Sequence, residues 1–166
     1  MSTHCNVIIK VKPEDIGKSV KFSSRKLPVK LKLWNAFENT RSKCKSITIE
    51  KPYIGIFCHF DGYPSGVGNV LLEKFNDYDS ILNLIAGGDC SSICCDSVIH
   101  YANRIGEKWN YVKPLQGDTA NRCVIDYPEY VYIFEDGSWK YCDVDWVPCK
   151  KNKFTFSEIH QLKLEY

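Results

Sequence analysis

The chain has 166 residues, of which 44% are hydrophobic and 25% charged, a composition typical of one soluble globular domain. No apolar run reaches the ~18 residues needed to cross a bilayer, and the start lacks the basic and apolar regions of a signal peptide, so we expect a cytoplasmic protein with no membrane partner. Nine cysteines with scattered spacing do not make a disulfide framework, and most are expected to be buried apolar side chains.

The net charge of +2 conceals an uneven distribution. Residues 1–51 hold twelve lysines and arginines against four acidic residues, whereas the remainder of the chain is acidic. A basic N-terminal third attracts nucleic acid, nucleotides or an acidic partner. The alternative is that it pairs with the acidic remainder across the fold, because lysine runs are most often solvated faces.

Four segments in the first part of the chain have strand character. Residues 5–11 are β-branched, residues 19–22 and 45–50 alternate polar with apolar, and residues 53–60 are apolar and aromatic. Because only Lys51 and Pro52 separate the last two segments, they are predicted to form a hairpin.

Two helices are predicted in the middle of the chain. Residues 67–75 place apolar side chains at helical spacing, and residues 80–86 follow Asp77 and Asp79, either of which is a suitable N-cap. Gly87-Gly88 is typical of a left-handed helix end.

The remainder mixes connectors with strands. Residues 89–96 are expected to form a polar connector, residues 97–102 a strand and residues 113–122 an exposed loop. Asp136-Gly137, between the strands 130–134 and 138–142, is the strongest hairpin signal in the chain. Three further expectations are a charged turn at 103–109, a last strand at 154–156 and a terminal helix at 157–164.

Hairpins on both sides of a central helix pair predict a single α+β domain with a mainly antiparallel sheet. Within it, residues 1–44 are expected to be a basic extension, 45–142 the core and 143–166 a tail.

Residues 53–69 are predicted to form a strand, a polar turn, a glycine loop and the start of a helix, an order that indicates a functional site. If the strand continues through His59 and Asp61, both side chains face one side, where a His–carboxylate pair performs acid–base work or holds a metal. The alternative is an ordinary turn in which Asp61 hydrogen-bonds its own backbone. Gly66 and Gly68 precede a helix, an arrangement that suits anion binding or, equally, close packing of the loop.

Other polar residues extend this candidate site. Arg104 has a planar guanidinium group that suits phosphate, although it also suits a local ion pair with Glu107. The aromatic side chains near it are of the type that stacks on nucleotide bases. The predicted ligand-binding set is His59, Asp61, Tyr63, Gly66, Gly68, Asp89, Ser91, Ser92, Tyr101, Arg104 and Trp109.

A metal centre is a weaker interpretation of the cysteines. The candidate cluster of Cys90, Cys94 and Cys95 with His100 contains no Cys-x-x-Cys pair. A nucleophile pair of Cys58 with His100 or His160 depends on contacts that spacing does not give. We therefore predict no catalytic residue, no metal and no cofactor.

The chain carries four motifs in order: C-H-F-D-G-Y-P-S-G-V-G-N-V-L-L (58–72), G-D-C-S-S-I (88–93), Y-A-N-R-I-G-E-K-W (101–109) and E-Y-V-Y-I-F-E-D-G-S-W (129–139). Together they resemble a widespread family of small, mostly uncharacterised phage and prophage proteins, over about residues 47–139. The resemblance implies a viral or prophage origin, with the host cytoplasm as the location. It implies no mechanism.

The leading hypothesis is a non-enzymatic binding protein, of a counter-defence kind, that holds an anionic nucleotide-like ligand near residues 58–68. One alternative is an inhibitor that binds a host protein or nucleic acid through its basic N-terminal region. Another is a hydrolase that uses His59 and Asp61.

Overall fold

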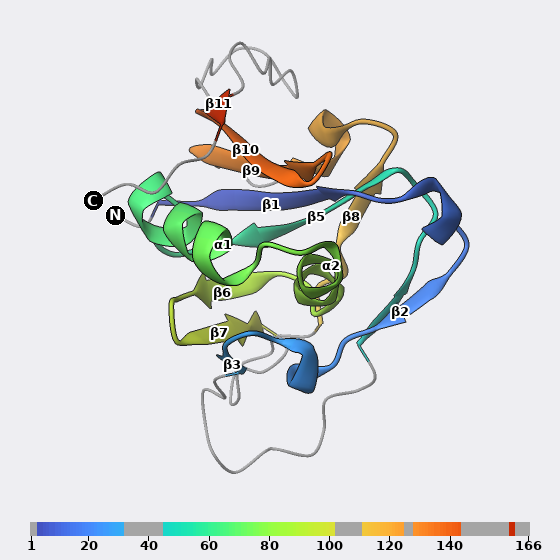
Figure 1. Cartoon of the computed structure of the whole chain (residues 1–166), viewed down its shortest axis with the longest axis horizontal. Coiled ribbons are helices and arrows are strands. Elements are labelled where there is room, and N and C mark those ends of the chain that lie inside the picture. Colours follow the sequence, from blue (N-terminus) through green and yellow to red (C-terminus); the bar gives the residue numbers. More distant parts are fainter. Residues whose placement is uncertain (1–2, 32–44, 102–110, 125–127, 144–159, 162–166) are drawn as a thin grey trace.

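A computed structural model describes residues 3–31, 45–101, 111–124, 128–143 and 160–161. The helices and strands of these residues form one α+β arrangement in which two short helices pack on a mixed sheet (Figure 1). No helix in the described ranges is long and apolar enough to cross a membrane.

The main sheet contains nine of the described strands. In spatial order they are β11 (His160–Gln161), β10 (Ser138–Asp143), β9 (Tyr130–Glu135), β1 (Cys5–Lys10), β5 (Tyr53–Cys58), β6 (Cys90–Ile93), β7 (Ser97–His100) and β3 (Lys30–Leu31), with β8 (Leu115–Gly117) paired to β5. Most neighbours are antiparallel, and the parallel pairs are β1/β9, β5/β6 and β3/β7. The predicted α+β class with a mainly antiparallel sheet is confirmed.

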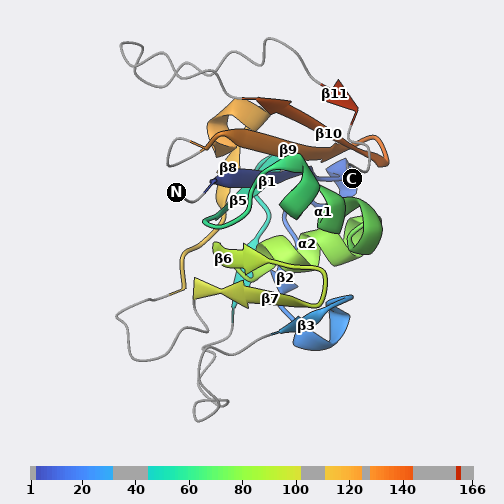
Figure 2. The ribbon, with the colours of Figure 1, turned by 90° about the vertical axis from the view of Figure 1, so that its left-hand side faces the viewer.

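The helices cover one face of this sheet. Helix α1 (Asn69–Lys74) follows a π-helical turn, η3 (Pro64–Gly68), and α2 (Tyr78–Ala86) begins where Asp77 accepts a hydrogen bond from the Ser80 amide at 2.8 Å. Figure 2 shows both helices on the same side of β1, β5 and β6. The predicted helices and the Asp77 cap are confirmed, and Gly88 takes the left-handed φ of +84° expected at the helix end.

The core divides between the two faces of the sheet. Alternate side chains of β1, such as Val7 and Ile9, pack with Leu84 and Ile85 of α2, whereas Ile8 points to the opposite face. There it meets a smaller cluster that includes Cys123 of the short helical turn η5 (Ala120–Cys123). Both faces of β1 are therefore buried, which explains its continuous apolar sequence.

The N-terminal residues are integral to this fold. The central strand β1 lies between β5 and β9, and β2 (Ser19–Lys21) pairs with β4 (Ser46–Thr48) in a separate two-stranded sheet. The residues expected as a basic extension thus supply the central strand β1, together with β2 and with β3 at the end of the described strand order.

The β9/β10 hairpin is confirmed, with φ of +53° at Asp136 and +78° at Gly137. The predicted 45–50/53–60 hairpin is wrong, because β4 pairs with β2 while β5 pairs with β1. Lys51-Pro52 lacks the glycine of a tight turn, and the Pro52 carbonyl instead accepts a hydrogen bond from the Val11 amide.

Three further expectations need correction. The expected connector at 89–96 contains β6, and the loop at 113–122 contains β8, because pairing with β5 outweighs their polar composition. At the C-terminal end, residues 160–161 pair with β10 as a strand instead of extending a helix. The charged turn at 103–109 and the strand at 154–156 lie outside the described residues.

Candidate functional site

The motif-rich segment after β5 forms a loop, which we call the 58–68 loop (residues 58–68). The chain first continues beside β6, with the His59 amide donating to the Cys90 carbonyl at 3.1 Å and the Phe60 amide to the Ser91 carbonyl at 3.0 Å. Asp61 then adopts a left-handed φ of +57° and turns the chain into η3. The loop therefore joins β6 to the start of α1.

The proposed His59–Asp61 alignment requires a strand that runs through both residues, and β5 ends at Cys58. The His59 ring packs between His4 and Phe60, with ring centroids 4.6 and 4.4 Å apart, while Asp61 is exposed. The turn interpretation of Asp61 describes this geometry better than an acid–base pair does.

The glycines of the loop serve close packing. Amides of Gly62, Gly66 and Gly68 donate to carbonyls of Thr3 and Tyr63, at 2.9, 2.9 and 3.4 Å. A Cβ atom on Gly66 would overlap the Asp61 carbonyl oxygen. Since these amides are committed within the protein, they do not offer the anion-binding group that Gly66 and Gly68 first suggested.

The second group of predicted residues joins strands together. Asp89 is 5% exposed, and its Oδ1 accepts a hydrogen bond from the Phe57 amide at 3.0 Å, while its carbonyl accepts one from the Tyr101 amide. Ser91 and Tyr101 are buried, Ser92 is half-buried and Tyr63 is exposed. Arg104 and Trp109 lie outside the described residues.

A buried polar cluster lies behind β6. The Cys90 Sγ and His100 Nδ1 atoms are 3.4 Å apart, and Lys45 is 3% exposed beside the Phe22 ring. Burial lowers the pKa of His100 to about 3 and that of Lys45 to about 8. Burial also raises the pKa of the Cys90 thiol, which makes it a poor nucleophile.

The metal interpretation finds no support in this cluster. Among the residues that the structure describes, no group of three or more His, Cys, Asp or Glu side chains is arranged to hold an ion. The His100 ring lies flat against Gly87, and its Nδ1 lies 3.0 Å from the Gly88 carbonyl oxygen. The cluster is consequently part of the packed interior.

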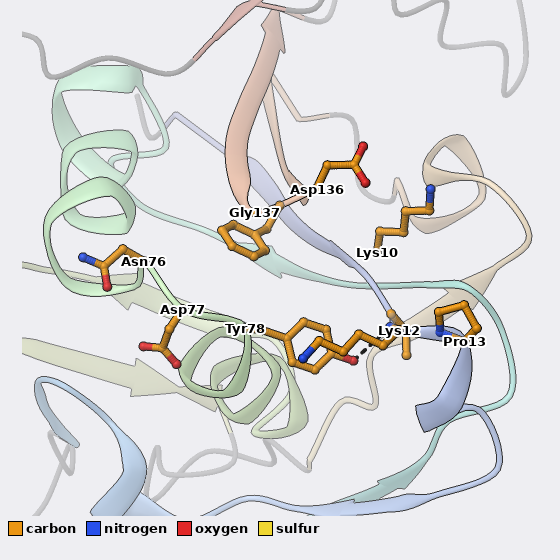
Figure 3. Close-up of a pocket in the computed structure, with 10 residues that line it drawn as sticks. Lys10, Lys12, Pro13, Asn76, Asp77, Tyr78, Asp136 and Gly137 are labelled. Carbon is orange, nitrogen blue, oxygen red and sulfur yellow. Dashed lines mark hydrogen bonds between the residues drawn. The ribbon is translucent and has the colours of Figure 1, made fainter.

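A cavity of about 520 Å³ opens elsewhere, between the end of β1, the α1–α2 link and the β9/β10 turn (Figure 3). We call it the Tyr78 cavity. Its lining is Lys10, Val11, Lys12, Pro13, Asn76, Asp77, Tyr78, Phe134, Asp136 and Gly137. None of these belongs to the predicted ligand-binding set.

The cavity combines fixed aromatic rings with cations. The Tyr78 hydroxyl donates to Asp15 Oδ2 at 2.7 Å and accepts from the Lys12 amide at 3.1 Å, which holds the ring in place. The Lys12 ammonium lies 4.4 Å from the centre of that ring, as Figure 3 shows. Phe134 packs edge-on against Trp139, so the second ring is fixed as well.

Lys10 and Lys12 differ in whether a described carboxylate already pairs with their ammonium group. Lys10 Nζ pairs with Glu135 Oε1 at 3.3 Å, and that carboxylate also accepts a hydrogen bond from the Tyr53 hydroxyl. No carboxylate in the described part of the chain forms an ion pair with Lys12. Its ammonium therefore keeps donors for an incoming anion while one side faces the ring.

A larger cavity of about 770 Å³, which we call the β2 cleft, runs between β2, the helical turn η2 (Ser24–Lys26) and the start of α2. Its lining is Asp15, Lys18, Ser19, Val20, Lys21, Lys26, Leu27, Pro28, Ile49, Asp77, Asp79, Ser80, Leu82 and Asn83. Both polar atoms of the Asn83 side-chain amide are hydrogen-bonded, since Oδ1 accepts from the Ser23 amide and Nδ2 donates to the Ser23 carbonyl.

Sequence reasoning missed both cavities. Lys10 and Lys12 counted as basic charge, Asp77 as a candidate N-cap and Asp136 as a turn residue. The one signal available was the alternation Lys10-x-Lys12 at the end of an apolar strand, a spacing that puts two cations on the same face of an extended chain.

Comparisons with known proteins gave no match: no protein-family model, no curated protein and no solved structure matches the chain. The resemblance to phage and prophage proteins thus stays a prediction from the four sequence motifs.

Proposed function

We propose that the protein is a phage- or prophage-type binding protein, of a counter-defence kind, that holds an anionic nucleotide-like ligand in the host cytoplasm without transforming it. We further propose that this ligand lies in the Tyr78 cavity and not against the 58–68 loop. The observation that carries the proposal is the Lys12 ammonium, 4.4 Å from the Tyr78 ring centre inside a cavity of about 520 Å³.

The chemistry of the cavity supports a ligand with one planar and one anionic part. Tyr78, which is half-buried, supplies a ring on which a base stacks, an interaction of ~1–3 kcal/mol per base, and the buried Phe134 ring forms part of the wall. Lys12 supplies the charge for a phosphate, and the exposed Asn76 amide supplies a donor and an acceptor at the rim. The volume lies in the usual range for small-ligand pockets.

The opposing charges limit the charge of the ligand. Asp136 lines the cavity, and Glu135 already pairs with Lys10, so Lys12 is the cation best able to accept an anion. Asp77 is engaged at the start of α2, where it caps the Ser80 amide. This balance favours a monophosphate or a cyclic phosphate over a triphosphate.

The test is a thermal-shift and calorimetric titration with nucleoside monophosphates, cyclic nucleotides and inorganic phosphate. At least one nucleotide should raise the melting temperature of the wild-type protein. Lys12→Met should weaken its binding about tenfold, which corresponds to the loss of one charge-assisted contact of ~1.4 kcal/mol.

The matched control is Lys30→Met, which removes an exposed lysine of β3 that lines neither cavity. Its affinity should equal that of the wild type. If no nucleotide stabilises the folded protein, or if both variants bind equally well, the proposal is wrong.

A further inference from the structure

Two buried cysteines lie directly opposite each other on neighbouring strands of the main sheet. Cys5 of β1 pairs with Cys58 of its antiparallel partner β5. Both thiols are free, both side chains are 0% exposed, and both belong to the core cluster that includes the apolar side chains of the helices. Directly opposite residues of an antiparallel pair have Cα atoms about 4.5 or 5.5 Å apart, and a disulfide needs roughly 4.4–6.8 Å. The backbone therefore holds the two cysteines at a separation that a disulfide can span.

The two thiols also interact with each other. Burial raises the pKa of the Cys5 thiol, and a hydrogen bond with the Cys58 side chain raises that pKa further. The Cys58 Sγ atom donates to the Phe60 carbonyl at 3.7 Å, so the first residues of the 58–68 loop contact the pair. A thiol with a raised pKa reacts slowly, because the thiolate is the reactive form. The pair is consequently protected for as long as it stays buried.

A third cysteine, Cys90 of β6, lies on the other side of Cys58. Its Sγ atom is 3.4 Å from His100 Nδ1 on β7, and it donates to the Gly88 carbonyl at 3.7 Å. The Cys90 thiol is thus engaged with groups beyond β6, whereas the Cys5 thiol is hydrogen-bonded to Cys58. Cys5 is therefore the partner that the structure favours for Cys58.

The 58–68 loop covers this pair of cysteines. Gly62 packs against Cys5, since a Cβ atom on Gly62 would lie 2.8 Å from the Cys5 Cβ atom. Two hydrogen bonds hold Gly62 in place, because its amide donates to the Thr3 carbonyl at 2.9 Å and its carbonyl accepts from the Tyr132 hydroxyl at 2.7 Å. The loop must move before a reagent from solution reaches either thiol.

From these features we propose that Cys5 and Cys58 are a redox-sensitive pair that forms a reversible disulfide beneath the 58–68 loop. The bond joins β1 to β5 and stabilises the folded protein, because it restricts the unfolded chain. The glycine-rich motif then has a role that needs no ligand, since its close packing controls access to the two thiols. Neither cysteine lines the Tyr78 cavity, so this inference is independent of the proposed nucleotide site.

The oxidant is a small disulfide such as oxidised glutathione. When the loop opens, one of the two protein thiolates attacks this disulfide, forms a mixed disulfide and releases one glutathione. The second protein thiolate attacks the protein sulfur of the mixed disulfide and releases the other glutathione. Each protein thiol loses its proton to a released glutathione thiolate, so one S–S bond replaces another and two electrons pass to glutathione. Excess reduced glutathione reverses both steps.

The opposing explanation is that Cys5 and Cys58 are only small apolar side chains of the core. Buried cysteines commonly have this role, and reducing compartments keep thiols reduced unless they are catalytic or redox-sensing. The two explanations differ in outcome, because thiols that serve only packing remain reduced in the folded protein when an oxidant is added.

The experiment incubates the folded full-length protein with excess oxidised glutathione, alkylates the remaining thiols, and maps disulfides by proteolysis and mass spectrometry. We expect a peptide pair linked through Cys5 and Cys58, and a melting temperature that rises by about 5 °C or more and returns with dithiothreitol. Cys5→Ala should lose both effects. The matched control Cys142→Ala, which removes a buried thiol from the opposite face of the sheet, should keep both.

A second measurement tests the covering role of the loop. Tyr132→Phe keeps the aromatic ring and removes the hydroxyl that binds the Gly62 carbonyl. The loop should open more often, so the disulfide should form at least about threefold faster, which corresponds to the loss of one hydrogen bond. The matched control is Tyr53→Phe, which removes a hydroxyl that donates to Glu135 and should leave the rate unchanged.

Several results would overturn the proposal. These are recovery of Cys5 and Cys58 as alkylated thiols, a disulfide that forms only after unfolding in urea, or a link from Cys58 to Cys90 in place of Cys5. Equal rates of disulfide formation in Tyr132→Phe, Tyr53→Phe and the wild type would show that the loop does not control access. Cys5→Ala should retain any nucleotide-induced thermal shift, so failure here is distinguishable from failure of the proposed ligand site.

Discussion

The 58–68 loop and the Tyr78 cavity differ in how their polar groups are used. In the loop, amides of Gly62, Gly66 and Gly68 donate to nearby carbonyls, and Asp89 behind it holds the Phe57 amide. In the cavity, the Lys12 ammonium faces an aromatic ring and has no ion pair with a described carboxylate. The polar groups of the 58–68 loop are used within the protein, whereas the Lys12 ammonium of the Tyr78 cavity keeps donors for an anion.

This difference shows that a conspicuous sequence motif can serve backbone packing and need not mark a ligand-binding site. The glycines and Asp61 are demanded by a tight backbone path, which only certain residue types can follow. The wall of the Tyr78 cavity restricts the choice of residue types less, because its lysines and rings come from three segments that are far apart in the sequence and ordinary in composition. The following predictions test the contrast, beginning with the largest expected effect.

The buried polar cluster of Cys90 and His100 should respond most strongly to acid. Burial holds the pKa of His100 at about 3, well below its ordinary value of 6.5, so the folded protein keeps the imidazole neutral. Below pH 6.5 the unfolded chain gains a proton that the folded protein does not, and stability falls as the pH drops toward 3. The loss should approach ~1.4 kcal/mol per pH unit, or about 5 kcal/mol in total.

Urea unfolding between pH 7 and 5 measures this slope before most carboxylates titrate. His100→Leu should flatten it, whatever the variant does to stability at pH 7. An unchanged slope in His100→Leu would show that another group is responsible.

A pair of glycine substitutions compares the two regions directly. Alanine at Gly66 places a Cβ against the Asp61 carbonyl oxygen, while alanine at Gly137, on the cavity rim, meets nothing within 4 Å and only strains a φ of +78°. Gly66→Ala should cost about 3 kcal/mol of unfolding free energy, and Gly137→Ala about 1 kcal/mol. Equal costs in chemical denaturation would remove the distinction between a closed loop and an open rim.

The smallest effect concerns Asp61 at +57° and Asp136 at +53°, the two non-glycine residues with positive φ in the described part of the chain. Replacing either with glycine should relieve backbone strain and raise stability by about 0.5 kcal/mol. Only Asp136→Gly should tighten nucleotide binding, about twofold, because it removes a negative charge from the cavity lining. A change in nucleotide affinity for Asp61→Gly would instead indicate that the ligand binds at the 58–68 loop.

Local signals in the sequence predicted local structure well. The Asp77 cap and the Asp136-Gly137 turn each depend on a few neighbouring residues, and both are confirmed. The 45–60 hairpin was wrong because strand pairing is decided by distant partners, here β2 for β4 and β1 for β5. Polar strands such as β6 were missed because pairing and burial override composition.

The candidate site was harder to predict for the same reason. The Tyr78 cavity needs the end of β1, the α1–α2 link and the β9/β10 turn to meet, and no local pattern records that meeting. The β2 cleft likewise depends on where β2, η2 and the start of α2 meet, which the alternating pattern of residues 19–22 does not record.

The most direct test of the central claim is an NMR titration of the full-length protein with the nucleotide that gives the largest thermal shift. The amide signals that move most should belong to residues 10–12, 76–78, 134, 136 and 137, which line the Tyr78 cavity. Signals of residues 59–68 should stay within the spread of the unperturbed core. Large shifts confined to residues 59–68, with the cavity residues unmoved, would contradict the account.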